Sequence, residues 1–111
     1  MPATSTPTDP AAVRGKLNFE SKCLACHSLG QGPRLGPDVL GVTKRRSDVW
    51  IAQWLKSPET MLASDEAAKA MLKEYKVPMP NQNLSDAEIK QYIKYFHWGD
   101  ENVKTEQRTK P

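Results

Sequence analysis

Residues 23–27 read Cys23-Leu24-Ala25-Cys26-His27, and this stretch decides how the rest of the chain is interpreted. Two cysteines three positions apart at the end of a predicted helix can bring both thiols to the two vinyl groups of one haem. The histidine that follows then points at the iron. C-x-x-C-H is the pattern of c-type haem attachment, so it predicts one covalent haem held by Cys23, Cys26 and His27.

A zinc site and a redox-active dithiol are the alternatives for the same cysteine pair. A closed zinc site needs four ligands, and the other histidine, His97, falls on a predicted helix without a ligand-type neighbour. A thioredoxin-like pair is expected beside a βαβ unit, whereas no stretch of this chain has the alternation of a strand. Covalent haem is the preferred interpretation, and both alternatives stay open.

The size and composition of the chain limit it to one small domain. It has 111 residues, a net charge of +3, 38% hydrophobic residues and a mean hydropathy of −0.66. The low apolar share is consistent with a core that a bound group completes. No apolar run approaches the roughly 18 residues of a membrane span, and no block of Lys and Arg interleaved with aromatic residues indicates nucleic-acid binding.

Two polar tails are expected to flank the domain. Residues 1–10 (MPATSTPTDP) have the composition of a flexible tether, without the basic start and apolar centre of a signal peptide. Residues 11–99 are expected to form the domain, and residues 100–111 a disordered tail.

The predicted fold class is all-α, with four to five helices. Apolar positions repeat at helical spacing, and caps such as Ser64 and the Ser85–Glu88 capping box mark helix starts. The expected helices cover residues 10–22, 48–56, 65–75 and 86–98, and the Gly/Pro-rich stretches 29–42 and 77–84 are expected loops.

Met79 is the candidate for the sixth iron ligand, because it lies between two prolines in a predicted extended loop. Such a stiff loop can present one thioether without needing a helix face. The other candidates are interpreted differently: Met71 as core filler on a helix stripe, Met61 as packing in a connector, and His97 as an exposed side chain at a helix end. A plain turn in which Met79 only fills a gap is the alternative.

The chain resembles the class I cytochromes c over roughly residues 11–98. The resemblance is carried by the C-x-x-C-H motif, by Met79, by a closing aromatic helix, by Gly15 and Phe19 ahead of the motif, and by Gly36-Pro37-Asp38-Val39-Leu40-Gly41 after it. It implies the cytochrome c fold wrapped around one haem c, with the first and last helices crossing closely at Gly15.

The resemblance also implies roles for individual residues. The Pro37 carbonyl is expected to accept a hydrogen bond from the second ring nitrogen of His27, which orients the ring and raises its basicity. Arg45 is expected to pair with a haem propionate, helped by Trp50 or Trp54, and a solvated helix start is the alternative for Arg45. The predicted cofactor-binding set is Cys23, Cys26, His27, Pro37, Arg45, Trp50, Trp54 and Met79, with His27 and Met79 on the iron.

Electron transfer, rather than enzymatic turnover, is the expected function. Iron with His and Met ligands is closed to oxygen, and both ligands suit both oxidation states. The chain is therefore expected to be an electron carrier, or an electron-transfer domain of a larger reductase, in a bacterial respiratory chain. Short motifs resemble those of cytochromes beside nitrogen-oxide reductases. A haem sensor with an open distal site and a haem-free metal or interaction module are the alternatives.

The resemblance further implies a place and a kind of partner. In this family haem is attached on the outer side of the bacterial inner membrane, so a periplasmic protein is expected, or one tethered to that face. The expected partners are redox proteins: a respiratory reductase, an oxidase, or a copper or haem protein. No nucleic acid and no membrane span are expected, and the chain is expected to be a monomer.

Overall fold

The computed structural model describes residues 7–23, 26–34, 36–76 and 78–103. These residues form helices and no strand, which confirms the predicted all-α class. They hold six helices: α1 (Pro10–Lys22), α2 (Val42–Arg45), α3 (Asp48–Lys56), α4 (Pro58–Ser64), α5 (Glu66–Tyr75) and α6 (Asp86–Asn102).

The expected count of four to five helices is too low because α2 and α4 are short. α2 has four residues at the end of a stretch expected to be loop, and α4 has seven. Pro58 follows the end of α3, as expected, but it also begins α4, since the first position of a helix needs no backbone N–H. Met61, expected in a connector, therefore lies on α4 and is only 8% exposed.

Side-chain caps begin the two helices that lead to and from the Met79 segment. The capping box of α6 is confirmed: Ser85 Oγ accepts from the Glu88 amide at 3.1 Å, and Glu88 Oε1 accepts from the Ser85 amide at 2.9 Å. The predicted cap Ser64 is wrong, because Ser64 is the last residue of α4. Asp65 caps α5 instead, accepting from the Ala68 amide at 2.9 Å.

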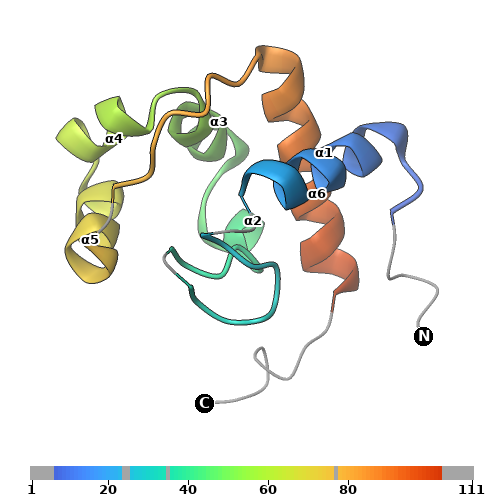
Figure 1. Ribbon diagram of the computed structural model, residues 1–111, viewed down its shortest axis with the longest axis horizontal. Helices are drawn as coiled ribbons and strands as arrows, with labels where there is room; N and C mark the ends of the chain where they lie inside the picture. The colour runs from blue at the N-terminus through green and yellow to red at the C-terminus, as the bar shows by residue number, and fades with distance from the viewer. Residues whose placement is uncertain (1–6, 24–25, 35, 77, 104–111) are drawn as a thin grey trace.

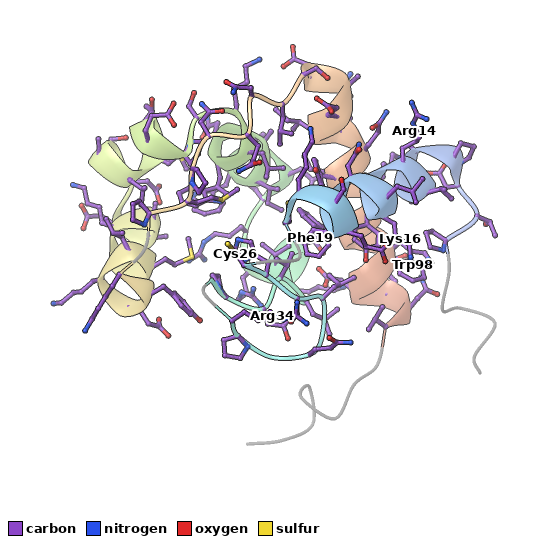
Figure 2. The ribbon with its side chains drawn as sticks, viewed as in Figure 1. Arg14, Lys16, Phe19, Cys26, Arg34 and Trp98 are labelled. Carbon is purple, nitrogen blue, oxygen red and sulfur yellow. The ribbon has the colours of Figure 1, made fainter. Side chains whose placement is uncertain are left out.

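The crossing of α1 and α6 is the most extensive helix contact of the fold (Figure 1). A Cβ on Gly15 would lie 2.1 Å from the Gln91 carbonyl oxygen and 2.8 Å from Tyr95 Cβ, so this crossing requires glycine, as the resemblance implied. The Phe19 ring packs against Tyr95 and Phe96, with centroids 5.6 and 6.0 Å away, where α1 ends against α6 (Figure 2). The chain thus enters the cysteine motif from a buried aromatic cluster.

α6 runs four residues beyond its expected end at residue 98, to Asn102. Residues 100–102, expected in the disordered tail, belong to this helix, and Asp100 is only 5% exposed. The difference arises because the buried face of α6 continues at helical spacing after Phe96. The rest of that tail from residue 104 onward, like residues 1–6 of the expected tether, lies outside the described residues.

α4 and α5 lie on the side of the molecule opposite α1 and α6 (Figure 1). Residues 26–34 and 36–41 form the loop before α2, in the lower part of the view, and residues 78–85 return from α5 to α6 across its upper part. Within the described part of the chain, no helix has the length and apolar character needed to cross a membrane.

Candidate functional site

One turn of chain after α1 brings Cys23, Cys26 and His27 together. The Cys23 carbonyl accepts from the amides of Cys26 at 3.0 Å and His27 at 2.8 Å, which closes this turn. No disulfide joins the two cysteines, and Cys26 lies near the centre of the molecule (Figure 2). Leu24 and Ala25, the middle of the motif, lie outside the described residues.

The loop after this turn fixes the His27 ring. The ring nitrogen Nδ1 lies 2.8 Å from the Pro37 carbonyl oxygen, which is the contact that the resemblance implied. A Cβ on Gly36 would lie 2.5 Å from His27 Cε1, so a glycine is needed for the backbone to approach the ring this closely. With Nδ1–H donating to a carbonyl, the lone pair of Nε2 is left for a metal, and the ring orientation is set.

Asp38 organises the loop that carries Pro37. Its carboxylate accepts hydrogen bonds from three backbone amides: Gly30 at 2.7 Å, Gly32 at 2.9 Å and Leu40 at 2.9 Å. Since Asp38 directly follows Pro37, these bonds also hold the Pro37 carbonyl against the imidazole.

A cavity extends from the cysteine turn toward α3 and α5. Its main part has a volume of about 530 Å³, and an adjoining part has about 110 Å³. Small-molecule and cofactor sites typically have volumes of about 300–1,000 Å³, so a cofactor fits here by size. The residues that line both parts are Cys23, His27, Pro37, Trp54, Met71, Tyr75 and Met79.

Two of the four ligand candidates face this cavity. Met79 lines both parts of it, and so does Met71. Met71, interpreted as core filler, thus lies at the cavity, where a packing role against a bound group stays a prediction. Met61 is buried on α4 and lines neither part. His97 Nε2 lies 2.7 Å from Asp48 Oδ1 in an exposed pair.

The rim of the cavity at α2 and α3 carries two arginines and two tryptophans. The predicted propionate contacts Arg45, Trp50 and Trp54 all line the larger part. Trp50 stacks on Trp54 with centroids 5.8 Å apart, and the Arg46 guanidinium lies 5.3 Å from the Trp50 ring. Trp50 Nε1 donates to Asp65 Oδ2 at 3.1 Å, whereas Trp54 Nε1 has no partner among the described residues.

On the α1 and α6 side, the cavity is lined by the buried residues Phe19, Cys23 and Phe96, and Tyr92 and Tyr95 pack against these phenylalanines. Burial raises the pKa of the Cys23 thiol, against smaller lowering effects of the Tyr92 hydroxyl and the Lys22 charge. Burial also raises the pKa of Tyr92, and it raises that of Tyr95 to about 12. Within the described residues, Tyr92 OH is the buried side-chain oxygen that lacks a hydrogen-bond partner of normal geometry. An environment of this kind suits an apolar ring system.

The other interpretations of the cysteine pair have no structural counterpart in the described residues. No three or more His, Cys, Asp or Glu side chains are grouped there as a metal site would need. The βαβ setting expected for a thioredoxin-like pair is also not found among those residues, which contain no strand.

The sequence profile of the cytochrome c family matches residues 12–100, which is most of the chain. The chain belongs to the cytochrome c family. Proteins of this family bind one covalent haem c, so this cytochrome c carries one such haem, as predicted. The family generally transfers electrons.

Solved structures of other cytochromes c share the fold, which confirms the predicted architecture. Cytochrome c from Rhodothermus marinus is 27% identical, with a TM-score of 0.82 over 93% of this chain and 92% of that chain. An engineered form of it, bound to a carbene intermediate, is 27% identical, with a TM-score of 0.76 over 92% of each chain.

A third structure is the cytochrome c domain of the PP3183 protein from Pseudomonas putida. It is 39% identical, with a TM-score of 0.68 over 75% of this chain and 84% of that chain. Among curated proteins, no sequence matches significantly.

Sequence reasoning missed the structural positions of three residues. Asp100 had a signal, since it follows Phe96 by four residues on the buried face of α6. Asp65 had none, because its bond to Trp50 depends on how α3 and α5 pack. Met71 was ambiguous, since a stripe of apolar residues on a helix can face either a core or a cavity.

Proposed function

We propose that this cytochrome c binds its haem through thioethers to Cys23 and Cys26, with His27 and Met79 on the iron, and that it transfers electrons. The observation that supports this most directly is the shared cavity. His27, held by Pro37 at 2.8 Å, lines the same space of about 530 Å³ as Cys23 and Met79. Bound there, haem supplies a one-electron couple between ferrous and ferric iron.

The side chains around the cavity then have distinct roles. The hydrogen bond from His27 to Pro37 orients the imidazole and raises its basicity as a ligand. The Met79 thioether favours the ferrous state. Ile51 and Leu55, which are 2% and 5% exposed, keep water from the ring on the α3 side.

Arg45 and Trp54 are the proposed contacts of the haem carboxylates. Arg45 supplies a positive charge at the cavity rim, and Trp54 lines both parts of the cavity with its indole N–H available. Trp50 already donates to Asp65 at 3.1 Å, so it fits a packing role between Arg46 and Trp54. Of the two tryptophans that the sequence left open, Trp54 is therefore preferred.

The proposed setting is a bacterial respiratory chain outside the cytoplasm, in the periplasm or on the outer face of the inner membrane. The partners are redox proteins: a reductase, an oxidase, or a copper or haem protein. The chain acts as a monomer, either free, tethered through residues 1–10, or as an electron-transfer domain of a larger reductase. The Pseudomonas putida relative, a cytochrome c domain of another protein, supports the last arrangement.

Met71 supports a second candidate function. Because it shares the cavity with Met79, it can compete for the same place and make the distal ligand labile. A labile distal position is what a haem sensor or ligand-binding protein requires. Carbon monoxide separates the two functions, since the reduced carrier should not bind it at neutral pH and the reduced sensor should.

Haem attachment is tested on protein produced with cytochrome c maturation machinery. We expect a c-type pyridine haemochrome spectrum and a chain mass increased by one haem. A chain left colourless by acid extraction, or a mass equal to the bare polypeptide, would contradict covalent attachment.

Ligand identity is tested on the same protein. The ferric form should show the weak near-infrared band of sulfur on iron, and Met79→Ala should abolish the band and admit carbon monoxide. Met71→Ala is the matched control, since it truncates the other methionine of the cavity, and it should keep the band. The reverse pattern would make Met71 the ligand.

A further inference from the structure

Asp100 is a buried carboxylate whose role neither the haem site nor the helix crossing explains. It is 5% exposed, and within the described residues only it and Ser28 are buried polar or charged side chains. It lies in the last turns of α6, far along the chain from the haem motif. A buried carboxylate is costly unless donors surround it, so its partners indicate its purpose.

All the hydrogen bonds of Asp100 go to the start of α2. Oδ1 accepts a short hydrogen bond from the Gly41 amide, and Oδ2 accepts from the Thr43 amide at 2.9 Å and from Thr43 Oγ1 at 2.5 Å. Gly41 is the N-cap of α2, with φ of 92°, and no side chain of the loop itself caps this helix. Asp100 therefore supplies, from α6, the cap that α2 lacks.

The Arg45 guanidinium rests on the same turn. Arg45 Nη1 donates to the Leu40 carbonyl at 3.1 Å, and a Cβ on Gly41 would lie 2.7 Å from that nitrogen. The Arg45 guanidinium thus packs on the backbone of residues 40–41. Asp100 holds this backbone in place by accepting from the Gly41 amide. Arg45 lines the cavity that we assign to haem.

We propose that Asp100 is a positioning residue, which fixes Arg45 at the cavity rim toward the haem carboxylates by clamping the first turn of α2. This inference rests on the proposed function, because it requires haem in that cavity. Asp100 links the end of α6 to the propionate side of the site by accepting from three donors. These are the amide of Gly41, which is the N-cap of α2, and the amide and hydroxyl of Thr43 on α2.

The signs of the charges make the clamp testable through the reduction potential. A cation near the haem disfavours ferric iron, so losing the Arg45 charge should lower the potential. Removing a negative charge at Asp100 should raise the potential if that charge acts only through space. A clamp acts in the opposite direction, because Asp100→Asn lets the Arg45 guanidinium move away and the potential then falls.

The experiment is a double-mutant cycle of reduction potentials on the holoprotein. The four forms are the wild type, Asp100→Asn, Arg45→Gln and the double variant. We expect Asp100→Asn to lower the potential in the wild type and not to lower it when Arg45 is already Gln. An equal rise in both backgrounds would show a charge effect only. No shift in either background would show a merely structural role. Both results would overturn the proposal.

Thr43→Val gives a second measurement that leaves every charge in place. It removes the hydroxyl donor at 2.5 Å from Asp100, so a lower potential in this variant can come only from a loosened turn. It also keeps the test open if Asp100→Asn fails to fold. An unchanged potential in Thr43→Val, together with unchanged hydrogen exchange at the Gly41 and Thr43 amides, would overturn the clamp.

Ser85→Ala is the control for general destabilisation. It breaks the capping box at the other end of α6, so it should lower stability and leave the potential unchanged. Each variant is first checked for its covalent haem and near-infrared sulfur band. Loss of those features in the wild type would refute the proposed function, whereas their presence without the Arg45 coupling would refute only the clamp.

Discussion

The loop that follows His27 and the segment that carries Met79 line the same cavity, yet the chain holds them in opposite ways. The first, residues 26–34 and 36–41, is cross-linked by hydrogen bonds, including buried ones. The second, residues 78–83 up to the buried Leu84, has exposed side-chain hydrogen bonds and relies on two prolines for its stiffness.

The histidine side is tied together at several points. Asp38 accepts from three backbone amides, and the buried Ser28 hydroxyl donates to the Gly32 carbonyl at 2.7 Å. The Gly36 amide donates to the Cys26 carbonyl at 2.7 Å, which closes the loop onto the cysteine motif. Opening this loop therefore breaks several bonds together.

The methionine side has fewer and more local ties. Asn81 Oδ1 accepts from the Asn83 amide at 2.7 Å, and Asn81 Nδ2 donates to Glu59 Oε1 on α4 at 3.0 Å. Prolines on both sides of Met79 limit the backbone angles but donate no hydrogen bonds. This segment can move away from the cavity at small cost.

The difference indicates where the site opens. Local opening favours segments with few buried contacts and solvent-exposed hydrogen bonds. We infer that exchange of the proposed distal ligand proceeds by movement of residues 78–83, while the buried Leu84 and the His27 side stay in place. With the proposed ligands His27 and Met79, one ligand would stay fixed and the other would lie in a stiff segment that can detach.

The largest expected effect is on stability. Asp38→Ala removes the acceptor of three amides, so we expect it to lower the free energy of unfolding by about 2–4 kcal/mol. Asn81→Ala, the matched change on the other side, should lower it by less than about 1 kcal/mol, because its bonds are exposed. Denaturant unfolding of the ferric protein measures both. Equal losses would mean that the two segments are held alike.

Where local chemistry decides the structure, the sequence predicts it well. The C-x-x-C-H motif and the Ser85–Glu88 capping box each depend on neighbours in sequence, and the structure has the capping box as expected. The close approach at Gly15 and the contact between His27 and Pro37 follow instead from the family resemblance, and the structure has both.

Where packing between distant elements decides the position of a side chain, the sequence alone does not predict that position. Whether Met71 faces core or cavity depends on how α5 lies against the cysteine turn. Asp65, rather than Ser64, caps α5 because the short helix α4 takes up Ser64. Asp100 was placed in a tail because its partners lie 57 to 59 residues away.

The second effect concerns ligand exchange and is smaller. Imidazole added to the ferric protein should displace Met79, which spectroscopic titration detects as loss of the near-infrared band. Asn81→Ala frees the segment from α4 and from its own turn. We therefore expect imidazole affinity to rise about threefold, which corresponds to roughly 0.7 kcal/mol.

Glu59 provides the control for that titration. Glu59→Gln keeps an oxygen that can accept from Asn81 Nδ2, so it should leave imidazole affinity close to the wild-type value, while Glu59→Ala should raise it. If Asn81→Ala and Glu59→Ala both leave the affinity unchanged, the surface ties do not limit opening, and the prolines alone hold the segment.

The smallest effect is the response of the α5 side to acid, which comes from Asp65. The hydrogen bond from the Ala68 amide, helped by the Trp50 indole N–H, lowers the pKa of Asp65 below its ordinary value of 3.8. Because the folded protein holds this carboxylate in its charged form, the stabilisation is fully present above pH 3.8. It is lost as the pH falls through the lower pKa of the folded state.

Asp65→Asn should therefore reduce stability at neutral pH and flatten its decline on acidification. Urea unfolding of the ferric protein at a series of pH values from about 6 to about 3 measures this slope. Trp50→Phe, which removes the smaller donor only, should flatten the decline less. If Asp65→Asn leaves the fall of stability with pH unchanged, the acid response arises from other groups and not from the cap of α5.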